Sequence, residues 1–257
     1  LKPALMYDLL DPITFTRLAT QPTLLKEETA PLNSGQQVVI DEIQKLPQLL
    51  DSVHSLIESK KLHFLLTGSS ARKLKRDSST NLLGGRAWEA HLFPLTSSEI
   101  SGFDLIRYLN FGGLPKIYLS KNPLEDLRAY IGIYLKEEIL AEALVRKLDH
   151  FSRFLEIAAQ QSGEELVFET IASDAAIKAK TVGNYIEILE DTLLGFKLNP
   201  FWKSKKRKAI TRSKFYLFDV GVTNFLAKRG QITKGSELFG KAFEQFIVCE
   251  TKAYLSY

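Results

Sequence analysis

The stretch Gln37-Val38-Val39-Ile40-Asp41-Glu42 decides the fold, because it is a β-branched apolar run that ends in two acidic residues. The run is too short for a helix and has little polar alternation, which is typical of a central strand in a parallel sheet. A helical pattern over 46–59 and a second apolar run, His63–Leu66, follow it. Strand, helix and strand within about 30 residues predict a βαβ unit. We therefore expect an α/β fold on a parallel sheet, with an earlier strand over 4–10 and a helix over 13–28.

Asp41 and Glu42 stand at the position where ligands of such sheets bind, the carboxyl ends of the strands. This is the arrangement of a Walker B site, in which Asp41 would hold the Mg²⁺ of ATP and Glu42 would orient and polarise the attacking water. A simpler interpretation is that the strand ends in acidic residues because solvent begins there. The two residues alone leave both interpretations open.

Two further segments add candidate groups for phosphoryl transfer. Thr67-Gly68-Ser69-Ser70 ends the second predicted strand, so Thr67 and Ser69 would sense the γ-phosphate or hold the water if the strands are neighbours. Arg86, beside two glycines, would stabilise charge on the transferred phosphoryl group, in cis or across a subunit contact. The alternatives are an ordinary turn at 67–70 and a surface ion pair at Arg86.

The chain changes character after Gly112-Gly113-Leu114-Pro115. Asn122 suits a helix N-cap and Pro123 suits the first helical position. Apolar residues at helical spacing continue to Gly163, and we expect two helices that are interrupted near 148–150.

The sequence pattern over 164–227 predicts a winged helix-turn-helix domain. Two short amphipathic helices with a tight turn between them precede a basic segment and a β-like run at 215–218. The stretch 197–214 holds eight Lys or Arg and no acidic residue, although the whole chain has a net charge of only +4. Local basicity of this kind is typical of a nucleic-acid contact.

The candidate DNA contacts lie at the start of the second helix and on the wing, where cations would bind phosphates. They are Lys178, Lys180, Thr181, Asn184, Lys203, Lys205, Lys206, Arg207 and Lys208. The alternative is a domain for protein contact with a solvated basic loop. Three acidic residues of the second helix favour this alternative, because they would repel a DNA backbone: Glu187, Glu190 and Asp191.

The composition sets outer limits on these interpretations. The 257 residues are 45% hydrophobic and 25% charged, which is ordinary for a globular protein. A single cysteine, Cys249, excludes a disulfide framework. The sequence contains no membrane-length apolar run and no export signal, so we expect a cytoplasmic protein without membrane contact.

Several motifs together carry a family resemblance. They are Val38-Val39-Ile40-Asp41-Glu42-Ile43-Gln44-Lys45, Leu65-Leu66-Thr67-Gly68-Ser69-Ser70, Leu82-Leu83-Gly84-Gly85-Arg86-Ala87, Phe93-Pro94-Leu95-Thr96, Phe111-Gly112-Gly113-Leu114-Pro115, Tyr134-Leu135-Lys136-Glu137-Glu138-Ile139, Ile188-Leu189-Glu190-Asp191-Thr192-Leu193-Leu194 and Phe218-Asp219-Val220-Gly221-Val222. In order and spacing, they resemble the prokaryotic AAA+-superfamily predicted ATP-binding proteins that carry a C-terminal domain of unknown function. The resemblance covers nearly the whole chain. It implies a P-loop-type sheet with flanking helices, followed by a helical region and the winged domain.

The resemblance also implies domain boundaries. Residues 1–105 would be the ATPase core, 106–163 a helical lid or linker, 164–227 the winged domain, and 228–257 the start of a nuclease-like domain. Glu244 would lie in the first helix of that last domain, most simply as a carboxylate on the helix face. We do not predict nuclease activity, because the resemblance places the catalytic residues of that domain beyond position 257.

One departure concerns the phosphate-binding loop G-x-x-x-x-G-K-[ST]. The resemblance places it just upstream of the strand at 4–10, and the motif does not occur in these 257 residues. We therefore expect that this chain is a fragment. It would begin downstream of the loop and end shortly after the start of the nuclease-like region.

Two functions from different classes follow. In the first, the intact protein is a Mg²⁺-dependent ATPase that couples nucleotide state to the winged domain, alone, as a homo-oligomer or with a protein partner. In the second, the ATPase fold is a degenerate scaffold, and the winged domain binds DNA or protein without catalysis.

The missing loop gives a direct prediction. The loop's backbone N–H groups and lysine provide the main hold on a triphosphate. Calorimetric titration of the 257-residue chain with Mg·ATP should therefore detect no binding in the micromolar range. Micromolar affinity would contradict this expectation.

Overall fold

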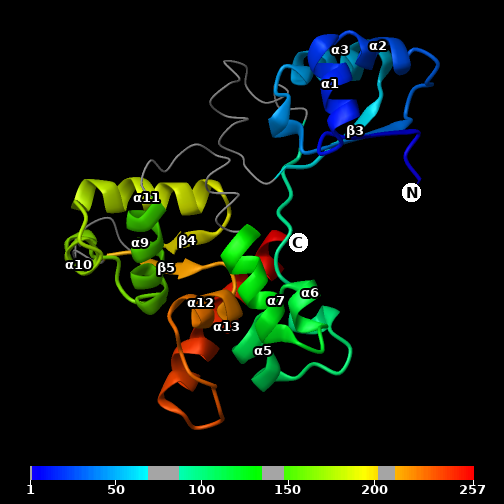
Figure 1. Cartoon of the computed structure of the whole chain (residues 1–257). Helices are drawn as coiled ribbons and strands as arrows, with labels where there is room; N and C mark the ends of the chain where they lie inside the picture. Colours follow the sequence, from blue (N-terminus) through cyan, green and yellow to red (C-terminus); the bar gives the residue numbers. More distant parts are fainter. Residues whose placement is uncertain (1, 69–86, 135–147, 202–211) are drawn as a thin grey trace. The chain divides into compact units, whose positions relative to one another are not determined.

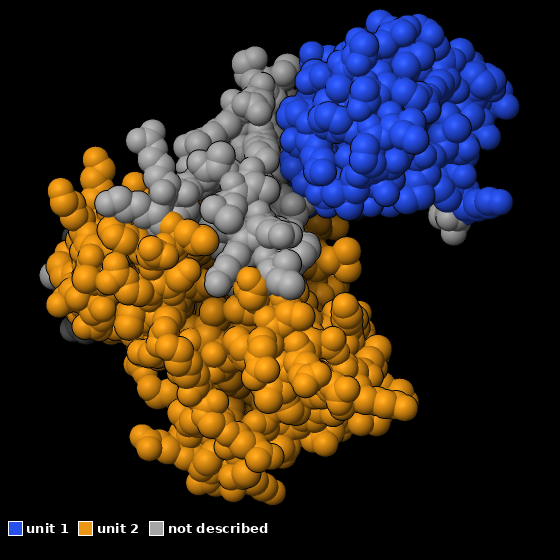
Figure 2. Space-filling model, viewed as in Figure 1, with its two compact units in different colours: residues 1–89 blue, residues 90–257 orange. Residues whose placement is uncertain are grey.

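The computed structural model describes residues 2–68, 87–134, 148–201 and 212–257 (Figure 1). The chain divides into two compact units, residues 1–89 and 90–257 (Figure 2).

The first unit contains a three-stranded parallel sheet in the order β1-β2-β3. Its strands are β1 (Leu5–Asp8), β2 (Gln37–Asp41) and β3 (His63–Leu66). The helix α3 (Leu49–Lys60) connects β2 to β3, which confirms the predicted βαβ unit and the α/β class. The remaining helical elements of this unit are α1 (Pro12–Thr20), α2 (Leu24–Glu28) and the 3₁₀ turn η1 (Ile43–Lys45).

The predicted helix over 13–28 is wrong in one respect, because it is two helices. Asp11 caps α1 by accepting a 2.9 Å hydrogen bond from the backbone N–H of Thr14, and Pro12 occupies the first turn. The helix ends at Thr20, and its C-cap Gln21 lies directly before Pro22. A proline lacks the N–H that would continue the ladder, and it biases the preceding residue away from helix.

The buried side chains of the sheet all lie on one face. Val38 and Ile40 are fully buried there, in one apolar cluster with residues of α1, α2 and α3. Met6, Val39 and Leu65 are register neighbours on the other face. Met6 is 62% exposed and Leu65 is 50% exposed. Parallel sheets are normally covered on both faces, so this apolar face is unusual for the fold.

The second unit is mainly helical. Its elements are η3 (Ser97–Glu99), α5 (Leu105–Phe111), α6 (Pro115–Tyr118), α7 (Pro123–Ala129), the π-helical turn η4 (Tyr130–Tyr134), α9 (Leu148–Gln160), α10 (Phe168–Asp174), α11 (Ala179–Asp191), β4 (Gly195–Leu198), β5 (Lys214–Leu217), α12 (Val220–Leu226) and α13 (Glu237–Ser256). The predicted helix start at Pro123 is confirmed. The predicted interruption at 148–150 is wrong in its position, because these residues form the first turn of α9.

The helices α9, α10 and α11 and the β4–β5 hairpin form one packed group. The rings of Phe151 and Phe154 contact Tyr185 of α11 at centroid distances of 5.0 and 5.2 Å. The hairpin is antiparallel, and Glu165 forms a single bridge to Lys214 of β5. Along the chain, these elements follow in the order α9, the bridge at Glu165, α10, α11 and the β4–β5 hairpin.

Asp219 joins two motifs that lie more than 100 residues apart in the sequence. Its buried carboxylate accepts hydrogen bonds from the backbone N–H of Val222 at 2.9 Å and of Gly113 at 2.8 Å. A Cβ added at Gly112, where φ is +78°, would lie 2.0 Å from this carboxylate, and one added at Gly221 would lie 2.1 Å from the Phe111 backbone. The glycines therefore permit the close approach that satisfies the buried acid.

Burial raises the pKa of the Asp219 carboxyl to about 6, and the backbone N–H groups that bind it act in the opposite direction. The ionised form of this buried carboxylate is stabilised only while the N–H groups of Gly113 and Val222 stay in place. It fixes the turn between α5 and α6 against the start of α12.

Asp219→Ala should destabilise the second unit by about 2–4 kcal/mol, because at least two buried N–H groups lose their acceptor. Urea unfolding together with hydrogen exchange of the amides at 112–114 measures this loss. Asp104→Ala is a matched control, since Asp104 caps α5 through one exposed hydrogen bond to Arg107. A loss for Asp219→Ala no larger than the loss for this control would contradict the assignment.

Candidate functional site

Asp41 and Thr67 lie side by side where β2 and β3 end. The strands are parallel neighbours, and Ile40 pairs with Leu66 immediately before the two residues. The Thr67 hydroxyl donates a hydrogen bond to Asp41 Oδ1 and accepts one from the backbone N–H of Glu42 at 3.2 Å. The expected juxtaposition of the acid pair with the first hydroxyl of the next strand is therefore confirmed.

Glu42 has an unusual backbone conformation, with φ 60° and ψ 42° in the left-handed region. This conformation turns the chain sharply from β2 into η1, and the N–H of Ile43 then donates to the Thr67 carbonyl at 3.0 Å. The Glu42 carboxylate accepts a 2.6 Å hydrogen bond from Gln44 Nε2. Non-glycine residues adopt this region at a cost of order 1–3 kcal/mol each. Four other described non-glycine residues also have a positive φ, so the conformation alone does not mark a site: Lys61, Ala176, Leu193 and Lys228.

Gln44 lies within the motif at 38–45, and the sequence alone indicates no role for it. Gln44 is only 5% exposed, although its side chain is polar. A glutamine two residues after an acid pair does not by itself indicate contact with the second acid, because that contact depends on the left-handed turn at Glu42.

The donor set at this edge suits Mg²⁺. Mg²⁺ prefers hard oxygen ligands, and proteins commonly hold it with one or two carboxylates together with substrate phosphates and water. Asp41 supplies a half-buried carboxylate and Thr67 supplies a hydroxyl bonded to it. Within the ranges that the structure describes, His, Cys, Asp and Glu form no cluster of three or more that could hold a metal ion by itself.

Ser69 and Arg86 lie outside the described residues. Their predicted roles as γ-phosphate sensor and arginine finger therefore stay predictions.

Four of the predicted nucleic-acid residues lie at the N-terminal end of α11. Lys178 precedes the helix at its N-cap, Lys180 and Asn184 are exposed, and Thr181 is half-buried. The five wing residues lie outside the described part of the chain: Lys203, Lys205, Lys206, Arg207 and Lys208.

One of the acidic residues of α11 has a cationic partner. The Glu190 carboxylate contacts the Lys197 ammonium at 2.8 Å and accepts a 3.2 Å hydrogen bond from the Lys197 backbone N–H. Glu187 is exposed on the helix. Lys197 therefore offsets part of the negative charge that the sequence places on α11.

Glu244 lies on α13, and its carboxylate contacts two residues of β5. Its Oε1 accepts hydrogen bonds from Lys214 Nζ and Tyr216 Oη, both at 2.7 Å. These hydrogen bonds lower the pKa of the Glu244 carboxyl, the one from Lys214 most strongly. The carboxylate thus fastens α13 to β5.

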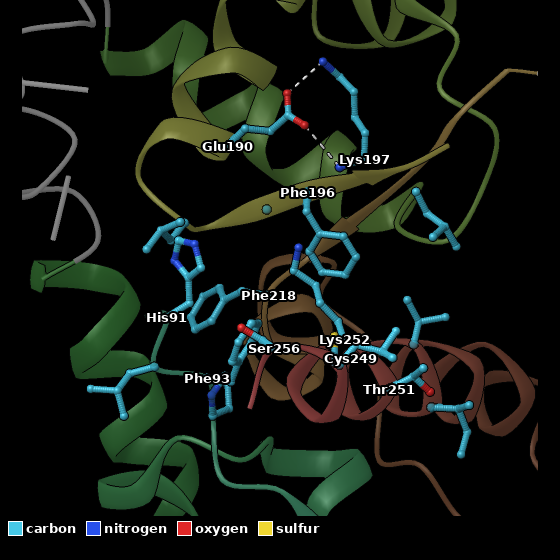
Figure 3. Close-up of a pocket in the computed structure, with 18 residues that line it drawn as sticks. His91, Phe93, Glu190, Phe196, Lys197, Phe218, Cys249, Thr251, Lys252 and Ser256 are labelled. Atoms are coloured by element: carbon cyan, nitrogen blue, oxygen red, sulfur yellow. Dashed lines mark hydrogen bonds and ion pairs between the residues drawn. The ribbon is translucent and has the colours of Figure 1, made fainter. Parts of the chain in front are cut away.

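The second unit also has a hollow of about 800 Å³ with mainly apolar walls, lined by residues of β4, α13 and the segment 91–94 (Figure 3). Lys252 places its ammonium 4.3 Å from the centroid of the Phe196 ring, a cation–π contact. Burial raises the pKa of the Cys249 thiol to about 12, so this cysteine is not an activated nucleophile. None of the predicted site residues that the structure describes lines the hollow.

Among the described residues, no helix combines the length and the apolar character needed to cross a bilayer.

Comparison with known families divides the chain in two. Residues 2–101 match an AAA domain, and residues 102–233, about half of the chain, match DUF8612, a domain of unknown function. The first match supports membership of the AAA-like P-loop ATPase class, to which the three-stranded parallel sheet and its helices also conform.

The similar curated proteins are uncharacterized. One from Mycobacterium tuberculosis is 24% identical over 263 residues, which cover 99% of this chain and 58% of that protein. One from Methanocaldococcus jannaschii is 24% identical over 273 residues, which cover 86% of this chain and 56% of that protein. The chain thus spans little more than half the length of these relatives, and no solved structure matches it significantly. On these matches, the chain belongs to the DUF8612 family, and its residues 2–101 match an AAA domain.

Proposed function

We propose that this chain belongs to a Mg²⁺-dependent ATPase and supplies the water-activating half of its nucleotide site. The observation that carries the proposal is the meeting of Asp41, Glu42 and Thr67 at the carboxyl ends of two neighbouring parallel strands. The AAA domain match over residues 2–101 supports the same class of reaction.

Each of the three residues has a separate role in this proposal. Asp41 binds Mg²⁺, which when bound neutralises charge on the terminal phosphates. Glu42 orients and polarises the water that attacks the γ-phosphate. Thr67 holds both neighbours in place, since its hydroxyl bonds to the Asp41 carboxylate and to the Glu42 backbone. Ser69 and Arg86 would act on the γ-phosphate from the following segments.

The complete activity is proposed for the longer protein. The chain covers 58% of the mycobacterial relative, and the phosphate-binding motif does not occur in its sequence. The loop that holds the triphosphate would be contributed outside these 257 residues, and DUF8612 would respond to nucleotide state.

Glu42→Gln in the full-length protein tests the role of the carboxylate. The amide keeps the shape but cannot polarise water, so turnover should fall about 10²–10⁴-fold while nucleotide affinity changes little. Phosphate release and nucleotide titration measure the two quantities. Glu58→Gln makes the same chemical change on an exposed turn of α3 and should leave both unaltered. Hydrolysis by Glu42→Gln at the parental rate would refute the role.

A second candidate function is DNA binding by a winged helix-turn-helix. The order α9, bridge at Glu165, α10, α11, β4 and β5 supports it, since winged domains have the same order of helices and hairpin. Lys178, Lys180 and Asn184 are exposed where a recognition helix meets DNA.

Electrophoretic shift at two salt concentrations tests this second function. We expect a shift with duplex DNA at low salt that weakens at high salt. Lysine and arginine side chains that bind DNA phosphates release counterions, and added salt opposes this release. The double change Lys178→Glu and Lys180→Glu should weaken binding about tenfold or more and lower the salt slope by roughly two. Lys116→Glu with Lys121→Glu changes net charge equally at exposed positions outside this domain. The absence of a shift at low salt would refute DNA binding.

A further inference from the structure

We infer that Gln44 is a positioning residue, which holds the Glu42 carboxylate and makes its place depend on the tip of β3. This inference rests on the proposed ATPase function and adds a control point to the same site. It concerns a buried side chain to which the sequence assigned no role.

The first step is the contact between Gln44 and Glu42. Gln44 Nε2 donates to Glu42 Oε2 at 2.6 Å, a short hydrogen bond to a carboxylate. Because Gln44 is 5% exposed, its side chain is packed and cannot rotate freely. The amide therefore fixes the direction of a carboxylate that stands on a left-handed residue.

The second step is the contact between Gln44 and β3. A Cβ added at Gly68 would lie 2.3 Å from Gln44 Oε1, so the carboxamide rests against the backbone of Gly68. Gly68 directly follows Thr67, the residue that bonds to Asp41. A movement of Gly68 toward Gln44 would therefore displace the carboxamide that holds the Glu42 carboxylate.

The contacts of Gln44 would link the position of the Glu42 carboxylate to the position of the end of β3. The sequence predicts that Thr67 senses the γ-phosphate, whereas Glu42 is proposed to activate the water. Gln44 contacts the Glu42 carboxylate and lies against Gly68, the residue after Thr67. The base would then be oriented for attack only when the tip of β3 is in its phosphate-bound position.

Gln44→Glu and Gln44→Ala in the full-length protein test the positioning role. The alanine variant should lose about tenfold or more in kcat with little change in KM, because the base is misplaced while nucleotide contacts stay. The glutamate variant keeps the size of the side chain but replaces the N–H donor to Glu42 with a carboxylate. Its kcat should therefore fall at least as far, again with little change in KM.

A double-mutant cycle with Gly68→Ala tests the connection to β3. Gly68→Ala should lower kcat by a similar factor, and it should cost nothing more in the Gln44→Ala background, where the methyl group has room. Gly240→Ala is the matched control, because a Cβ there meets no atom within 4 Å.

The outcomes separate this inference from the proposed function. If Glu42→Gln abolishes turnover but both Gln44 variants keep the parental kcat, or if the effects of Gly68→Ala and Gln44→Ala are independent, the ATPase assignment stands and the role of Gln44 is refuted. If the full-length protein does not hydrolyse Mg·ATP, the proposed function itself fails. A purely structural role for Gln44 would lower thermal stability without a selective loss of kcat.

Discussion

The parallel pairing of β2 with β3 is the constraint on which the candidate site depends. Because Ile40 pairs with Leu66, the next residue of each strand, Asp41 and Thr67, meets its counterpart at the same sheet edge. A slip by one residue would move every side chain to the opposite face, away from α3 and its neighbours. The burial of Val38 and Ile40 against those helices therefore fixes the register, and the register creates the site.

The second unit uses a different device for the same purpose. A buried carboxylate, Asp219, draws a turn and a helix start together, and Gly112 and Gly221 leave it room. Gln245 makes a comparable buried connection from α13, donating to the Leu217 carbonyl and to the Thr223 hydroxyl. Buried polar groups are costly unless each is satisfied, so such contacts specify one arrangement of the helices.

Charge pairing changes the interpretation of the basic stretch 197–214. Its first cation, Lys197, contacts Glu190 of α11, and its last, Lys214, contacts Glu244 of α13. Both ends of the stretch thus contribute to internal attachment of the hairpin. An electrostatic contact with a partner must rely on the cations between these ends, and on Lys178 and Lys180 at the start of α11.

The sequence by itself determined the α/β class, the βαβ unit and the existence of α10, α11 and the hairpin, because apolar spacing reports which face of each element is buried. It also predicted that Asp41 and Glu42 lie beside Thr67, since the carboxyl ends of parallel strands share an edge. It missed the division at Pro22, the contact of Gln44 with Glu42 and Gly68, and the meeting of Gly113 with Asp219. Only the tertiary structure decided these contacts, because they depend on backbone dihedral angles and on close approach between distant segments, and hydrophobic periodicity records neither.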